Sequence, residues 1–71
     1  MKYLVIIEKG ITGYGAYVPD LPGCVAVAKT RPRIKRLIRE AIQLHLDDMR
    51  DRGYPIPKPR TASELVELER N

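Results

Sequence analysis

The sequence predicts a small α+β domain in which three short strands come first and one long helix follows. Three runs of β-branched, aromatic or small residues lie between turn signals within residues 2–28, which is typical of short strands. Apolar residues then recur at three- and four-residue spacing over residues 32–52, which is typical of a helix with one apolar face. A chain of 71 residues allows a single domain, 1–71, with a small core of its own.

The first strand is expected over residues 2–9, where apolar side chains alternate to both faces, as in a central strand covered on both sides. A turn at residues 10–13 leads into the second strand, over residues 14–19, and completes a hairpin. Residues 19–23 contain two prolines and a glycine, and proline cannot donate to a sheet ladder. The third strand is therefore expected to begin only at residue 23 and to run to residue 28.

The helix has recognisable start and stop signals. Thr30 is a suitable N-cap, Pro32 fits the first turn and Gly53 follows the last turn. The apolar stripe begins at Ile34 and ends at Met49. Between them, the residues expected to pack on the sheet are Leu37, Ile38, Ala41, Ile42 and His45.

The segment after the helix is predicted to be extended. Proline occupies every second position from 55 to 59, so residues 54–60 should form a stiff connector. The tail that follows, residues 64–70, fits two structures. Thr61 and Glu64 have the spacing of a capping box, which would start a short helix. The alternation of Glu, Leu and Val that follows is equally compatible with an edge strand.

The net charge of +4 comes from one short stretch of the chain. Residues 1–28 balance, residues 40–71 carry a net −2, and residues 29–39 contain six basic residues and no acid. Such a patch can attract a phosphate backbone or an acidic protein surface, although most charge runs simply face solvent. The candidate nucleic-acid patch consists of Arg31, Arg33, Lys35 and Arg36, within the stretch from Lys29 to Arg39.

The chain carries a compound motif that resembles one family. Residues 14–24 read Tyr-Gly-Ala-Tyr-Val-Pro-Asp-Leu-Pro-Gly-Cys, residues 38–42 read Ile-Arg-Glu-Ala-Ile, and residues 55–57 read Pro-Ile-Pro. Together they resemble the HicB antitoxin family over nearly the whole chain. The resemblance implies a partial RNase H-like fold, β-β-β-α-β, in which the fourth strand pairs with the first to give the sheet order 3-2-1-4. It therefore favours a strand for residues 64–70.

The resemblance also implies a function. HicB-like antitoxins typically bind and neutralise a small RNA-cleaving toxin, HicA, by protein–protein contact. We assign the partner contact to two tyrosines of the second strand and to the proline loop after it, namely Tyr14, Tyr17, Asp20, Leu21, Pro22 and Gly23. Many relatives add a C-terminal helix-turn-helix or ribbon-helix-helix module that binds DNA. This sequence ends where that module would begin, so DNA binding of that kind is not expected. The alternatives are a nucleic-acid-binding module that uses the basic stretch and an orphan structural domain.

The residues argue against an enzyme. RNase H-type nucleases gather several carboxylates around two metal ions, whereas the acids here are scattered, and Asp47 and Asp48 lie among arginines on the helix. His45 falls on the apolar stripe without a nearby nucleophile, and Cys24 has no second cysteine. We therefore expect no catalytic residues, no metal site and no cofactor.

Composition and patterning also give expectations for location and assembly. The chain has one cysteine, and no run approaches the roughly 18 apolar residues that a membrane span needs, so a cytoplasmic protein without membrane contact is expected. A single helix can cover only one face of the sheet, yet the first strand is apolar on both. We therefore expect a homo-oligomer, either a homodimer or a dimer of dimers forming a tetramer, or else a different partner on the open face.

Overall fold

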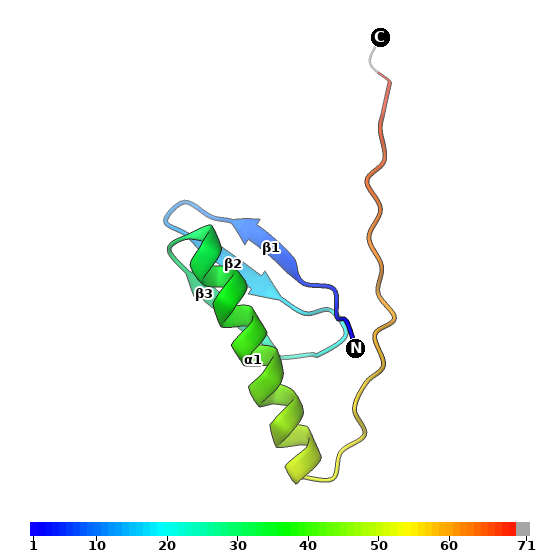
Figure 1. Cartoon of the computed structure of the whole chain (residues 1–71). Coiled ribbons are helices and arrows are strands. Elements are labelled where there is room, and N and C mark those ends of the chain that lie inside the picture. Colours follow the sequence, from blue (N-terminus) through cyan, green and yellow to red (C-terminus); the bar gives the residue numbers. More distant parts are fainter. Residues whose placement is uncertain (70–71) are drawn as a thin grey trace.

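The computed structural model describes residues 1–69 as a three-stranded antiparallel sheet with one long helix packed against a single face (Figure 1). The strands are β1 (Ile6–Lys9), β2 (Tyr14–Tyr17) and β3 (Val25–Ala28), and the helix is α1 (Arg31–Asp51). The sheet order is β1-β2-β3, so β1 and β3 are the edge strands. The α+β class and the antiparallel sheet are confirmed.

The strands are shorter than predicted, and the turn after β2 explains why. Ile6 pairs with Tyr17 and Val25 pairs with Tyr17 from the other side, so the ladder ends at this row. The next residue, Val18, donates its N–H to the carbonyl of Cys24 at 3.2 Å and accepts from Leu21 at 3.0 Å. These bonds form a loop rather than a strand. Residues 2–5, 18–19 and 23–24, predicted as strand, therefore lie outside the sheet.

The helix is predicted almost to the residue. Thr30 is the N-cap, and its Oγ1 accepts from the N–H of Arg33 at 3.3 Å. At the other end, Gly53 adopts a φ of 74°, which glycine reaches without the strain of a side chain. The N–H groups of Gly53 and Tyr54 then donate to the carbonyls of Arg50 and Met49 at 3.0 and 2.9 Å, which is the Schellman arrangement that closes a helix.

The core lies between α1, the sheet and the loop after β2. Leu21 and Ile34 are completely buried. The other buried members of this core are Ala16, Val18, Cys24, Ile38 and Leu46. Of the helix residues predicted to pack on the sheet, Ile38 is buried, while Leu37, Ala41, Ile42 and His45 are half-buried. Leu46 is a core residue that the prediction omitted.

The predicted fourth strand is not formed within the described chain. Residues 54–69 have no helix or strand, and the tail extends away from the body as a single thread (Figure 1). A strand exists only where a second strand supplies hydrogen bonds, and no other segment of residues 1–69 lies beside this one as a ladder partner. Arg70, the last residue of the predicted strand, lies outside the described residues.

Candidate partner-binding surface

One face of the sheet has no helix on it and carries large apolar side chains. Along β3, the small side chains of Ala26 and Ala28 pack towards the core, whereas Val25 and Val27 are 65% and 79% exposed. Tyr17 lies in the same row as Val25 and is 42% exposed. We call Ile11, Tyr17, Val25 and Val27 the open face. Apolar surface gathered on one face of a small domain is typical of a binding site.

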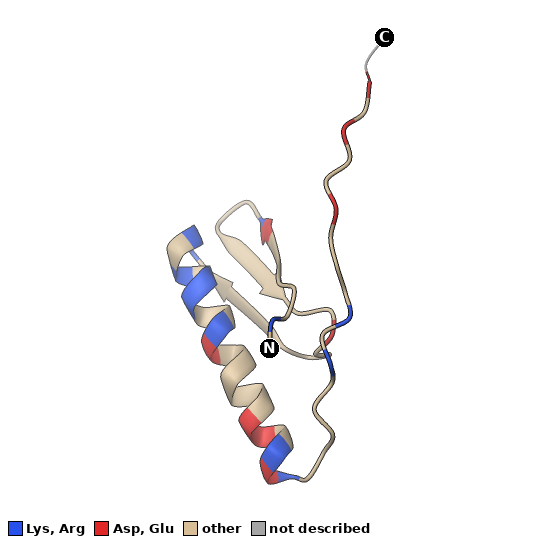
Figure 2. Cartoon of the chain, turned by 45° about the vertical axis from the view of Figure 1, so that its right-hand side comes forward, with Lys and Arg blue, Asp and Glu red and all other residues tan. Residues whose placement is uncertain are grey.

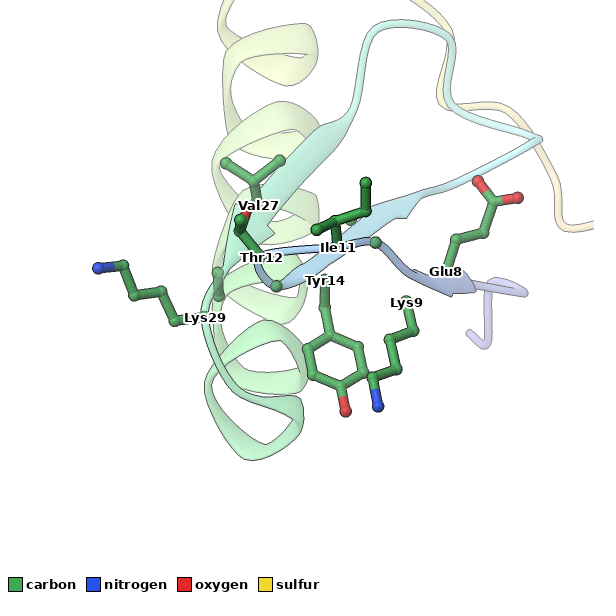
Figure 3. Close-up of a pocket in the computed structure, with 11 residues that line it drawn as sticks. Glu8, Lys9, Ile11, Thr12, Tyr14, Val27 and Lys29 are labelled. Atoms are coloured by element: carbon green, nitrogen blue, oxygen red, sulfur yellow. The ribbon is translucent and has the colours of Figure 1, made fainter.

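A shallow hollow lies at the end of the open face that is formed by the β1–β2 turn (Figure 3). It measures about 610 Å³ and is lined by residues 8–15 and 27–29. Ile11, Val27 and Glu8 stand together on one side of the strands, and Tyr14 and Lys9 point to the other side (Figure 3). Gly15 lies between Glu8 and Val27 in the strand register, and a Cβ added to it would meet no atom within 4 Å. The absent side chain therefore leaves space that an apolar side chain from a partner could fill.

The hairpin that carries this hollow depends on a close backbone approach. A Cβ built on Gly13 would lie 2.5 Å from the carbonyl oxygen of Ala28 and 3.2 Å from the Cα of Lys29. These are backbone atoms, which cannot move aside as a flexible side chain would. Glycine at this position therefore allows the β1–β2 turn, closed by the bond from Gly10 N–H to the Gly13 carbonyl, to lie against the end of β3.

The structure separates the residues that the sequence groups as partner contacts. Tyr17 belongs to the open face, while Pro22 and Gly23 are exposed on the loop after β2, where Pro22 lines a separate hollow with Pro57 and Arg60. Tyr14 is half-buried and packs against the core on the helix side. Leu21 is fully buried, so its side chain is unavailable to a partner. Alternation of bulky valines with small alanines along β3 is the sequence signal that could have identified Val25 and Val27.

Asp20 has a different environment from its neighbours, because its carboxylate holds the base of the tail. Its Oδ2 accepts from the backbone N–H groups of Arg60 and Thr61, both at 2.9 Å, and its Oδ1 accepts from the Thr61 hydroxyl at 2.6 Å. Nearby, the Tyr3 hydroxyl donates to the carbonyl of Pro57. We call these four bonds the tail clamp. They join the proline connector to the loop after β2 and to the N-terminal segment.

The three Asp20 bonds of the tail clamp should break in acid. The Thr61 hydroxyl, followed by the N–H groups of Arg60 and Thr61, lowers the pKa of the Asp20 carboxyl below its ordinary value of 3.8. Because a lowered pKa means that the folded state favours the charged form, the contribution of these bonds is present above pH 3.8 and is lost as the pH falls through the folded pKa. We expect the amide resonances of Arg60 and Thr61 to shift together with the Asp20 carboxyl resonance below pH 3.8 in an NMR titration. In Asp20→Ala they should lie at their released positions throughout, whereas Glu8→Ala should titrate like the parent; equal curves in all three proteins would contradict the clamp.

The basic stretch lies on the exposed side of α1, away from the open face. Arg31, Arg33, Lys35, Arg36 and Arg39 are all exposed, and Lys and Arg dominate the first half of the helix (Figure 2). Within the described part of the chain, both side-chain ion pairs lie at the other end of α1, between Arg50 and Asp47 at 3.3 Å and between Arg52 and Asp48 at 3.0 Å. The first half of the helix therefore presents positive charge that these acids do not neutralise.

The remaining candidate groups do not form a reactive cluster. Over residues 1–69, no three His, Cys, Asp or Glu side chains gather in a way that could hold a metal ion. Burial raises the pKa of the Cys24 thiol, which lowers the thiolate fraction needed for nucleophilic attack. A membrane-crossing helix is also missing from the described residues, since α1 is not apolar enough.

Comparisons with known proteins agree with the motif. Residues 3–71 match the family described as "HicB_like antitoxin of bacterial toxin-antitoxin system". A UPF0150 protein of Thermoplasma acidophilum is 39% identical over 67 residues, which cover 93% of this chain and 96% of that protein. An uncharacterised 14.9 kDa protein of Haemophilus phage HP1 is 32% identical over 66 residues, or 93% of this chain. The match spans only 50% of the phage protein, and 61% of a Helicobacter pylori UPF0150 protein that is 48% identical over 44 residues.

A solved structure shows the same fold. A chain of a "HicA3 and HicB3 toxin-antitoxin complex" superposes with a TM-score of 0.73 at 30% identity, covering 84% of this chain and 70% of that one. The family match covers almost the whole sequence, and the sheet, the single helix and the proline loop all fall within it. The chain therefore belongs to the family of HicB-like antitoxins of bacterial toxin–antitoxin systems.

Proposed function

We propose that this protein binds a small, RNA-cleaving, HicA-type toxin through its open face and neutralises it by contact, without catalysis of its own. The observation that carries the proposal is the exposure of Ile11, Tyr17, Val25 and Val27 on one side of the sheet. A similar structure was solved as a HicA3–HicB3 complex, which supports a protein toxin as the partner. Since the toxin's substrate would be cellular RNA, the complex would form in the cytoplasm.

The shape and charge of the open face suit a protein partner. Its centre is apolar, and the charged side chains of Glu8 and Lys29 stand at the rim of the hollow (Figure 3). An apolar centre with a polar rim is the usual composition of a protein–protein interface. Tyr17 is 42% exposed on this face, and tyrosine is enriched among the residues that dominate binding energy. The proposed contact set is the open face together with the exposed loop residues Pro22 and Gly23.

Co-expression with the toxin tests this function. We expect that a HicA-type protein encoded next to this chain's gene arrests growth when expressed alone, and that this chain restores growth and co-purifies with the toxin. The test variant is Gly15→Phe, compared with the parent chain. Its phenylalanine would fill the floor of the hollow without entering the core, since the space above Gly15 is empty. This variant should stay folded and lose rescue. Growth arrest that persists in the presence of the parent chain would contradict the proposal.

A nucleic-acid-binding module remains the second candidate, because the basic stretch is exposed along α1. If RNA or DNA binds there, its affinity should fall steeply with salt as counterions are released. The two functions use different surfaces, so reversal of charge at Arg33 and Lys35 separates them: it would remove nucleic-acid binding and leave rescue from the toxin intact.

A further inference from the structure

The outer edge of β1 is a surface without a ladder partner. Because the sheet order is β1-β2-β3, one side of β1 pairs with β2 and the other side ends the sheet. Apolar residues continue in front of β1, from Tyr3 to Val5, and β2 does not reach them, since its last pair is Tyr17 with Ile6. An unpaired edge of this kind is a ready template for another strand.

The tail has the complementary property, because it is strand-like in sequence and its apolar side chains are exposed. Leu65, Val66 and Leu68 are 102%, 69% and 79% exposed, although β-branched and apolar side chains at alternating positions are typical of strands. In an extended chain Val66 and Leu68 share one face, while Leu65 lies on the other. Their exposure shows that the tail does not contact the β1 of its own chain.

The tail clamp fixes where the tail leaves the body. Asp20 holds Arg60 and Thr61, and Tyr3 holds Pro57. The exit point therefore lies beside the N-terminal segment, and from there the tail runs outward, past the end of the sheet (Figure 1). The molecule is consequently 54 Å long and only 28 and 16 Å across. A segment held at its base and extended into solvent is placed to reach a second molecule.

We propose that residues 62–69 of one copy add as a fourth strand to the outer edge of β1 of a second copy, and that the reciprocal exchange closes a two-fold dimer. The lengths agree, since eight tail residues extend over about 26 Å and residues 2–9 of the receiving copy number eight as well. The receiving residues 2–5 would gain the ladder partner that β2 does not give them. Two identical exchanged contacts make a closed, isologous dimer, which is the commonest symmetric assembly.

Charge favours the same pairing. Residues 62–69 carry three acids and no base, and Lys2 and Lys9 stand at the two ends of the receiving segment, with Glu8 as its one acid. The acids of the tail and the bases of α1 occupy separate regions of each molecule (Figure 2). Exchange at the edge also leaves the open face uncovered, so the dimer and the proposed toxin contact are compatible. The inference goes beyond the proposed function and does not depend on it.

Light scattering of the full chain at micromolar concentration gives the first test. We expect twice the mass of one chain for the parent and for Val66→Thr, because threonine keeps the strand preference. Val66→Pro should have the mass of one chain with an unchanged helical circular dichroism spectrum, because proline removes a ladder donor from a residue that is exposed in the single chain. A parent chain that is monomeric, or a Val66→Pro variant that remains dimeric, would overturn the proposal.

A spin-label experiment distinguishes exchange from a strand within one chain. The spin label is attached to Leu68→Cys in a Cys24→Ala background, in protein of natural nitrogen isotope content. This protein is then mixed with ¹⁵N-labelled protein that carries no spin label. Broadening of the Ile6, Ile7 and Glu8 amides in the mixture is the expected result. Broadening only when the spin label and ¹⁵N are on the same chain would show a strand formed within the chain and overturn the exchange. Toxin rescue is not part of either readout, so failure here is separate from failure of the proposed function.

Discussion

Replacement of Leu21 by alanine is expected to remove about half of the protein's free energy of unfolding. Leu21 has no exposed surface, and removal of a fully buried leucine side chain costs about 2–5 kcal/mol. A domain of this size has a free energy of unfolding of about 4–10 kcal/mol, so one substitution removes a large part of it. Urea denaturation followed by circular dichroism should show a much lower midpoint with an unchanged slope.

Leu44 provides the matched control for this loss. It is also a leucine, but it lies on the solvent side of α1 with 70% of its surface exposed. Leu44→Ala should shift the free energy of unfolding by less than about 0.5 kcal/mol. If Leu21→Ala and Leu44→Ala have the same midpoint, the loop after β2 is not part of the core in solution.

Introduction of a charge into the open face, as in Val27→Glu, is expected to weaken toxin binding by about 30-fold or more and leave the fold intact. Val27 is 79% exposed in the free protein, so a glutamate there stays hydrated until a partner covers it. In the complex it would be a buried, unpaired charge, and losses of 2 kcal/mol or more are typical at the centre of an interface, which corresponds to about 30-fold weaker binding. Isothermal titration with the purified toxin measures the difference.

Leu44→Glu is the control for this variant, because it adds the same charge at a similarly exposed position on the opposite side of the molecule. We expect it to bind the toxin with the affinity of the parent chain. Equal binding by Val27→Glu and the parent would place the toxin elsewhere on the surface, while loss in both variants would point to a general charge effect rather than to the open face.

Local signals account for the parts of the fold that could be predicted from the sequence. The two ends of α1 were predictable because Thr30 and Gly53 bond to residues close to them in sequence. Thr30 accepts from Arg33, and Gly53 lies in the turn that ends at Tyr54. The strand ends were less predictable, because they depend on where a neighbouring strand stops. The sequence shows that residues 2–5 are apolar, but only the loop bond from Val18 to Cys24 shows that β2 does not accompany them.

The environment of the predicted site residues depends on the fold in a similar way. Of the residues predicted to contact a partner, Tyr17, Pro22 and Gly23 are exposed, and their role in binding stays a prediction. Leu21 is buried because the loop after β2 folds back onto the core. The sequence of this loop alone does not determine that packing. The bonds of Asp20 join residues 40 and 41 positions apart, so no local pattern could reveal them.

The tail clamp has a mechanical consequence. Because Asp20 joins Arg60 and Thr61 to the loop after β2, a pulling force applied to the end of the chain reaches that loop before it reaches α1. The three bonds of one carboxylate share the load, and the segment between residues 20 and 60, which contains β3 and the whole of α1, carries no tension while they hold. Stretching from the C-terminus should thus produce a first, small rupture that releases this slack, followed by unravelling of the helix from its last turn.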